Sequence, residues 1–210
     1  MTYRLPIKWH RLVTIAIAAF LISVGLSSWK TSQTRASNVP QNILLAQDVS
    51  TVWEKGSFPV ENFQSYTSPY GYRASPVTGK RQFHNGLDLA APRGSYIRNW
   101  WGGRITDLSD NTACGTSLTI QSGSWTHSYC HMEGHVEYHP NGRFLIDRDG
   151  GIQLVLGQDV PAGARIGRIG MTGRTTGPHL HWVLKHNGKY VDPGLVLKEM
   201  FKRQTVSSAS

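Results

Sequence analysis

From about residue 52 onward, short apolar runs are interrupted by Gly, Pro, Asn or Asp at intervals of about eight to twelve residues. This spacing is typical of an all-β domain, in which each apolar run forms one strand and each interruption forms a turn. The pattern predicts strands at 95–101, 104–108, 115–121, 125–131, 152–156, 164–169, 179–186 and 189–191. Asn187-Gly188 separates the last two runs, and this dipeptide is a strong hairpin signal. We therefore predict an all-β fold made of antiparallel sheet.

Two segments depart from this pattern. Residues 132–151 contain the turn signals PNG and DGG, which predict one extra hairpin. The apolar positions of LVLKEMFK, residues 195–202, predict one short helix near the C-terminus. We place one domain at 51–200 and a C-terminal tail at 201–210.

The first 29 residues have the pattern of a targeting segment. Arg4, Lys8 and Arg11 precede the uncharged run LVTIAIAAFLISVGL at 12–26. A run of this length matches the core of a secretory signal and falls short of the roughly 20 residues of a membrane span. The sequence leaves open a cleaved signal peptide, an uncleaved membrane anchor and, as a third interpretation, a buried core helix. In the first two, the basic residues stay cytoplasmic and the rest of the chain is exported.

The remaining charge is modest and scattered. The net charge is +9, of which residues 1–49 contribute +4 (five Lys or Arg, one Asp) and residues 50–210 contribute +5. The basic residues form no run, so we expect no nucleic-acid partner. A mildly basic surface suits either an anionic matrix or plain solubility. Residues 30–50 are rich in Ser, Thr, Gln and Asn and predict a linker.

The two cysteines, Cys114 and Cys130, lie in strand-like runs on either side of SGS at 122–124. In a hairpin centred near Ser122 they would face each other, with Cα atoms about 4.5–5.5 Å apart. A disulfide can bridge that distance, and export permits its formation. We therefore predict a Cys114–Cys130 disulfide.

Two groups of residues are candidates for metal chemistry. In TGPHLHW, residues 176–182, strand alternation places His179 and His181 on one face, and Leu180 on the other. In HNGLD, an Asn-Gly turn brings His84 and Asp88 to one point. The other histidines are interpreted as part of the targeting segment or as plain polar residues: His10, His127, His135, His139 and His186.

These groups combine into a zinc site. Zinc in hydrolases usually takes three His or carboxylate ligands and leaves its fourth position to water. His84, Asp88 and one of the two histidines at 179 and 181 would supply three ligands. The remaining histidine would be free for proton transfer, which peptide hydrolysis requires.

Three stretches resemble the lysostaphin-like (LytM-type) zinc endopeptidases, in the order found in that family. They are SPYGYRASPVTGKRQFHNGLDLAAPRG, HSYCH and GARIGRIGMTGRTTGPHLHWVLKHNGKYVDP. The resemblance covers residues 68 to 193. It implies one zinc ion per chain bound by His84, Asp88 and His181, with His131 and His179 as catalytic residues. It also implies an antiparallel β fold with a long groove and cleavage of peptidoglycan stem or cross-bridge peptides.

The resemblance leads to further expectations. The stretch at 132–151 is longer than usual in the family, so it would form a wall or lid of the groove. Strand parity would place His131 and Tyr129 on one face, with Cys130 pointing away, so that the disulfide braces the hairpin from behind. Arg73 and Arg174 would meet an anionic wall polymer.

We expect a monomer that acts on peptidoglycan peptides outside the cytoplasm. It would be free in the periplasm, in the cell envelope, secreted, or anchored to the inner membrane through its N-terminus. Two other functions are open at this point. One is a non-cleaving wall-binding or hydrolase-activating module, and the other is a zinc peptidase that acts on proteins outside the wall.

Overall fold

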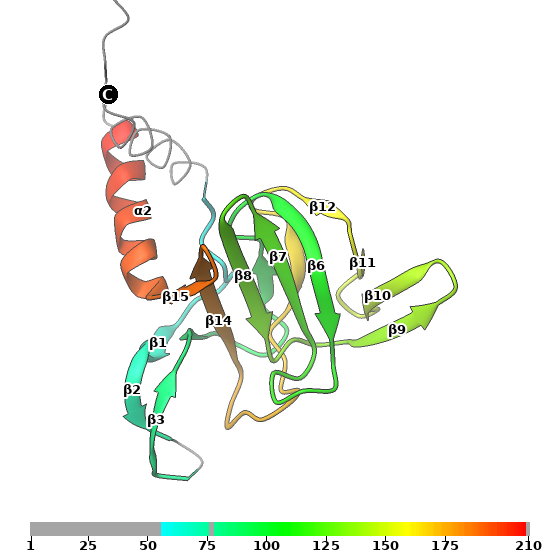
Figure 1. Ribbon diagram of the computed structural model, residues 1–210, viewed down its shortest axis with the longest axis horizontal. Coiled ribbons are helices and arrows are strands. Elements are labelled where there is room, and N and C mark those ends of the chain that lie inside the picture. The colour runs from blue at the N-terminus through cyan, green and yellow to red at the C-terminus, as the bar shows by residue number, and fades with distance from the viewer. Residues whose placement is uncertain (1–55, 76–77, 209–210) are drawn as a thin grey trace, which may run out of the picture. The chain divides into compact units, whose positions relative to one another are not determined.

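The computed structural model describes residues 56–75 and 78–208 (Figure 1). The predicted targeting segment, 1–29, and linker, 30–50, lie outside these residues. Within the described residues, no helix has both the length and the apolar character needed to cross a membrane.

The described residues are mostly β-strand with one helix, which confirms the predicted fold class. The strands and the helix are β1 (Ser65–Ser68), β2 (Gly71–Ala74), β3 (Arg81–His84), β4 (Leu87–Ala90), β5 (Tyr96–Arg98), β6 (Gly103–Ser109), β7 (Ser117–Ser122), β8 (Trp125–Cys130), β9 (His135–His139), β10 (Gly142–Asp147), β11 (Ile152–Val155), β12 (Asp159–Val160), β13 (Arg165–Arg168), β14 (His179–His186), β15 (Lys189–Val191) and α2 (Pro193–Ser207).

The main sheet is antiparallel, with strand order β1-β4-β14-β8-β7-β6-β12, and β15 pairs with β14 (Figure 1). Three small sheets accompany it: β11-β10-β9, β13-β5 and β2-β3. Each predicted strand is present, and 179–186 and 189–191 have the predicted limits. The sequence pattern missed β1 to β4 and β12, which are two to four residues long and contain no continuous apolar run.

Strand β14 follows the predicted alternation and supplies the centre of the core. Leu180, Trp182 and Leu184 are fully buried on one face. Leu89 of the neighbouring β4 is buried on the same side, opposite Leu180 in the ladder. Because this face is filled with large apolar side chains, the other face of β14 is left for the two histidines.

The segment 132–151 forms the predicted extra hairpin, β9-β10, which joins β11 in a three-stranded sheet. It packs beside β6, where Arg143 donates to the Asp107 carboxylate at 2.9 Å and to the Leu108 carbonyl at 2.8 Å (Figure 1). None of its residues is among those that line the cleft described below, and its role as a groove wall or lid stays a prediction. The apolar side chains of this hairpin pack into the core beside β6.

The helix is longer than the predicted eight residues. It runs from Pro193 to Ser207, so the predicted domain limit at residue 200 and tail at 201–210 cut through it. Asp192 caps its N-terminus by accepting a hydrogen bond from the Gly194 backbone at 2.8 Å. Val196, Leu197 and Met200 are buried and attach the helix to the core.

The predicted disulfide between Cys114 and Cys130 is present, but the predicted register is wrong. The hairpin pairs Ser122 with Trp125 and Leu118 with Tyr129, so its two-residue turn is Gly123-Ser124. At this register Cys130 does not face Cys114. Cys114 reaches it from the loop before β7, with the two Cα atoms 4.9 Å apart.

A chain of buried polar groups crosses the core beside β8. His127 contacts Ser122 Oγ through Nε2 and the Tyr129 hydroxyl through Nδ1, both at 2.8 Å. The Tyr129 oxygen also accepts the Trp100 backbone N–H at 2.8 Å, and the hydroxyl lies 3.3 Å from Asn99 Oδ1. His127 is therefore a core residue with satisfied hydrogen bonds rather than a plain polar one.

This burial predicts an acid-sensitive fold. Burial lowers the pKa of His127 to about 3, against about 6.5 in an unfolded chain. Between these values the unfolded state takes up a proton and the folded state does not. The free energy of unfolding should therefore fall as pH decreases from about 6.5 towards 3, by up to about 1.4 kcal/mol per pH unit from this residue.

Urea unfolding at pH 7, 6, 5 and 4 measures this slope. His127→Gln should reduce it, because the variant lacks the buried ring that stays neutral in the folded state. An equal slope in the wild type and His127→Gln would contradict the prediction.

Candidate metal and catalytic site

The site begins with a cross-strand pair. Asp88 on β4 lies directly opposite His181 on β14. Opposed residues of an antiparallel ladder project from the same face. His181 Nδ1 accordingly lies 2.8 Å from Asp88 Oδ1.

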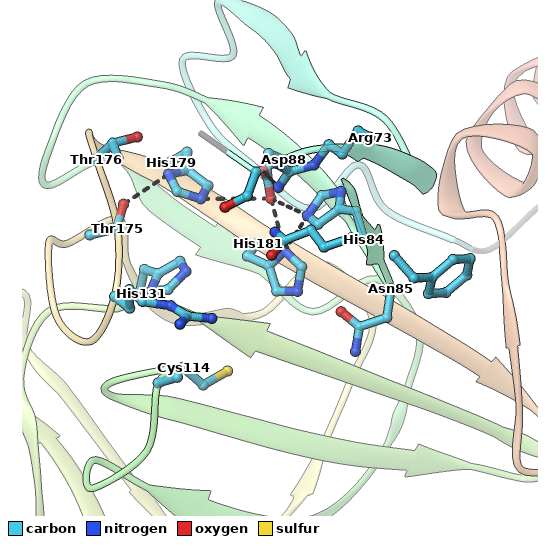
Figure 2. A pocket seen from close by; sticks show the side chains of 15 residues that line it. Arg73, His84, Asn85, Asp88, Cys114, His131, Thr175, Thr176, His179 and His181 are labelled. Atoms are coloured by element: carbon cyan, nitrogen blue, oxygen red, sulfur yellow. Dashed lines mark hydrogen bonds and ion pairs between the residues drawn. The ribbon is translucent and has the colours of Figure 1, made fainter. Parts of the chain in front are cut away.

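The third member, His84, comes from a different sheet. It is the last residue of β3, and Asn85-Gly86 turns the chain from there into β4. His84 Nε2 lies 3.1 Å from Asp88 Oδ1 and 3.0 Å from His181 Nδ1, so the three side chains meet at one point (Figure 2). The predicted turn between His84 and Asp88 is thus present, with Asp88 in a strand.

Gly86 is required at this turn by close packing. A Cβ at this position would lie 2.7 Å from His181 Cε1 and 2.6 Å from the Trp182 carbonyl oxygen. Both distances are shorter than real Cβ contacts allow. Any side chain at residue 86 would therefore push His181 out of place.

The three residues fit a divalent cation such as zinc. One donor atom from each of His84, Asp88 and His181 lies within 4.8 Å of the others, and the donor types are those that zinc prefers. His84 Nδ1 donates to the Pro69 carbonyl at 2.7 Å, which leaves Nε2 free to be a ligand. Metal-binding histidines are commonly oriented by such a carbonyl.

The charge state of Asp88 also suits a cation. Burial by itself would raise the pKa of this carboxyl, but hydrogen bonds with His181 and His84 outweigh it and hold the pKa well below its usual range. The carboxylate is therefore ionised. Its second oxygen, Oδ2, lies 3.7 Å from Arg73 Nη2, a contact that the sequence did not predict.

The other two predicted histidines lie beside this group. The His131 and His179 ring centroids are 5.0 Å apart, and His131 lies 6.1 Å from the His181 ring. His179 Nε2 is 3.6 Å from Asp88 Oδ1. The structure therefore brings all five predicted site residues together (Figure 2).

Backbone carbonyls set the orientation of both rings. His131 Nδ1 donates to the Thr172 carbonyl at 2.9 Å, and His179 Nδ1 donates to the Gly177 carbonyl at 2.8 Å. In the neutral form of either ring, this contact leaves Nε2 without a proton and able to accept one. Burial lowers the pKa of His131 to about 4, against a smaller opposing effect of the Thr172 carbonyl, so His131 is neutral at pH 7.

The predicted strand parity around His131 is wrong. Tyr129 points into the core, and Cys130 pairs with His181 in the ladder, so Cys130 shares the face of the site. His131 follows the last residue of β8 and has φ of 62°, which breaks the alternation and turns its side chain into the site. Cys114 lines the cleft, so the disulfide forms part of its wall instead of bracing it from behind.

Two loops that pack against each other hold His131 and His179 in place. Gly115 and Gly173 pack backbone against backbone, since a Cβ on either would lie 2.4 Å from the backbone nitrogen of the other. Both have φ values in the left-handed region, +63° and +70°. Thr172 links the loops by accepting the Thr116 N–H at 2.8 Å and donating to the Met132 carbonyl at 2.9 Å.

The site opens into a cleft with a volume of about 360 Å³. Its walls are the β2-β3 hairpin, the disulfide loop at Cys114 and the loop that contains Thr175 and Thr176 (Figure 2). Sequence reasoning missed the threonines and Cys114. The threonines stand just before the His-x-His pair in MTGRTTGP, and this proximity was the signal that could have indicated them.

The fold and the site define a class of protein: an antiparallel β domain whose cleft holds a candidate metal site and two further histidines, as in metallohydrolases. The sequence signature of peptidase family M23 matches residues 149–193. A DD-carboxypeptidase/endopeptidase, Mpg, of Neisseria meningitidis serogroup B is 31% identical over 150 residues, which are 70% of this chain and 31% of that protein.

Solved structures of peptidases show the same similarity. A zinc-containing peptidase from Vibrio cholerae is 30% identical, with a TM-score of 0.50 over 64% of this chain and 37% of that one. Lysostaphin from Staphylococcus simulans, 22% identical, shares the fold with a TM-score of 0.50 over 69% of this chain and 56% of that one. The chain is therefore similar to peptidase family M23 over residues 149–193 and has the lysostaphin-like fold. It spans about a third of the length of the curated relatives it matches.

The packing at Gly86 gives a test of metal binding. Gly86→Ala should displace His181 and reduce the zinc retained after gel filtration, measured by mass spectrometry of the metal. Gly102→Ala is the matched control, because a Cβ there meets its nearest atom at an ordinary 3.5 Å. Equal zinc content in the two variants would show that His181 is not a ligand.

Proposed function

We propose that the protein is a zinc-dependent endopeptidase that hydrolyses peptide bonds in the stem or cross-bridge peptides of peptidoglycan. The observation that carries the proposal is the convergence of three candidate metal ligands and two oriented histidines in one cleft. The names of the relatives support the substrate. Besides Mpg, they include the peptidoglycan DD-endopeptidase ShyA of Vibrio cholerae, 31% identical over 137 residues.

In this proposal His84, Asp88 and His181 hold one zinc ion. Zinc supplies Lewis-acid catalysis for the attack of water on a carbonyl. The zinc-containing peptidase from Vibrio cholerae, with its similar fold, supports this choice of metal. The Pro69 carbonyl orients His84, and Arg73 lies against the second oxygen of Asp88.

His131 and His179 are the proposed catalytic residues. With Nδ1 of each ring committed to a backbone carbonyl, the Nε2 atoms do the proton chemistry. One Nε2 accepts a proton from the attacking water as oxygen bonds to the peptide carbonyl carbon. The other stabilises the developing oxyanion when its ring is protonated, because Nε2 then carries a hydrogen that it can donate. When the C–N bond breaks, the accepted proton passes to the leaving amine, and the products are a carboxylate and an amine.

A non-cleaving wall-binding or activating module is the competing function. Such a module has no need for two additional histidines held 5.0 Å apart by separate carbonyls. A digestion assay separates the two functions, because a module would bind peptidoglycan without releasing amino groups. Mass spectrometry of the fragments would also identify the bond that is cut, and elastin-like substrates would test for cleavage of proteins outside the wall.

The proposal places the domain outside the cytoplasm, where peptidoglycan lies. The predicted signal or anchor segment at 1–29 agrees with export. So does the disulfide, since such bonds persist mainly in oxidising compartments.

Substitutions should separate metal binding from proton transfer. In purified residues 50–210 we expect one zinc per chain and release of amino groups from peptidoglycan. His179→Ala should keep zinc and lower the rate at least about 100-fold, the usual contribution of a general acid or base. His84→Ala should lose both zinc and activity. Wild-type rates in His179→Ala would exclude the proposed role of this histidine.

The disulfide should support His131, because Cys130 directly precedes it and the Cys114 carbonyl accepts its backbone N–H at 2.8 Å. Replacing both cysteines by Ser should lower kcat about tenfold or more, by displacing the ring, with zinc retained. The free energy of unfolding should fall by about 3 kcal/mol, as expected for a sequence separation of 16 residues. A lower stability with unchanged kcat would show that the bond does not position His131.

A further inference from the structure

The arginines of the described residues are unevenly matched with carboxylates. Away from the cleft, each lies against an acidic side chain, except Arg81, which lies over the Tyr72 ring. The pairs are Arg93–Glu133, Arg98–Glu61, Arg165–Glu61, Arg104–Asp159, Arg143–Asp107, Arg148–Glu137, Arg168–Asp147 and Arg203–Glu199. The protein thus neutralises most of its guanidinium groups internally.

Arg174 is different. It lines the cleft, and its side chain has no hydrogen bond or ion pair with any residue from 56–75 or 78–208. Within these ranges, the acidic residue that lines the cleft is Asp88. Two histidines already contact its carboxylate, and so does Arg73. The cleft therefore presents an unmatched guanidinium beside the site.

The backbone holds Arg174 in this place. Its N–H donates to the Ala113 carbonyl at 2.9 Å, and the preceding Gly173 packs against Gly115. Two residues earlier, the Thr172 carbonyl orients His131, and five residues later the strand presents His179. A group bound by Arg174 would lie in the same small cleft as both histidines.

A guanidinium group binds a carboxylate well, because its planar fork can donate two parallel hydrogen bonds. We propose that Arg174 binds a free carboxylate on the substrate, on a residue at or next to the scissile bond, and so makes the enzyme selective for peptides that carry this carboxylate. This inference rests on the proposed function and names the substrate class that the same site prefers. Arg73, already directed at Asp88, acts on the metal-site carboxylate instead.

Matched substrates test the proposal. The probes are cross-linked muropeptide dimers whose diamino acid carries a free carboxylate, and the same dimers with that carboxylate converted to a carboxamide. Wild-type kcat/KM should be about tenfold or more higher for the free carboxylate, the effect of one charge-assisted hydrogen bond. Arg174→Gln should remove this preference through a raised KM with kcat unchanged, as expected for binding that is equal in ground and transition states.

Controls distinguish binding from a structural role. Arg174→Lys should restore part of the preference, and Arg104→Gln, which removes the same charge on β6 outside the cleft, should keep all of it. A fall in kcat in Arg174→Gln with the preference retained would overturn the proposal, because it would indicate a displaced histidine. Equal cleavage of both dimers by the wild type would overturn this proposal and leave the proposed function intact. Cleavage of neither dimer would overturn this proposal, and absence of amino-group release from whole peptidoglycan as well would overturn the proposed function.

Discussion

The register between β4 and β14 is the constraint on which the site depends. It sets Asp88 opposite His181 on one face, while Leu89 and Leu180 face each other in the core. A shift of one residue would bring Asp88 into the core and a leucine into the cleft. The burial of those leucines therefore fixes the metal-site geometry, because the same alternation that fills one face of the sheet clears the other.

The sheet places only one of the two remaining histidines. His179 follows from β14, but His131 lies beyond the end of β8 in a left-handed conformation. Its place is set by the disulfide loop and by the loop at Thr172, which touch through Gly115 and Gly173. The site thus has two supports: a ladder for Asp88 and His181, two of the three candidate metal ligands, and a pair of interlocked loops for His131, which the ladder cannot reach. The single disulfide ties the second support to the first at Cys130, the ladder partner of His181.

The pairing of arginines with carboxylates also differs between the cleft and the rest of the domain. Outside the cleft, most arginines of the described residues form ion pairs with carboxylates. These pairs leave little electrostatic field there from the positive net charge. In the cleft, Asp88 is shared among two histidines and Arg73, so Arg174 has no carboxylate partner within residues 56–75 and 78–208. A cleft of one predominant sign concentrates ligands of the opposite sign.

The sequence by itself predicted the β class, the limits of β14 and β15, the extra hairpin, the cysteine pair and the five residues that the structure brings together in the cleft. These follow from alternation, turn residues and short motifs, all of which are local or carried by the family resemblance. Only the tertiary structure decided that short segments such as Arg81–His84 and Leu87–Ala90 are strands, since each is too short for a clear pattern of its own and is defined by its pairing partner. It also decided the hairpin register that moved Cys114 into a loop, the direction of His131 and the packing of the extra hairpin beside β6. Each of these depends on contacts between residues far apart in the chain, which a local pattern does not contain.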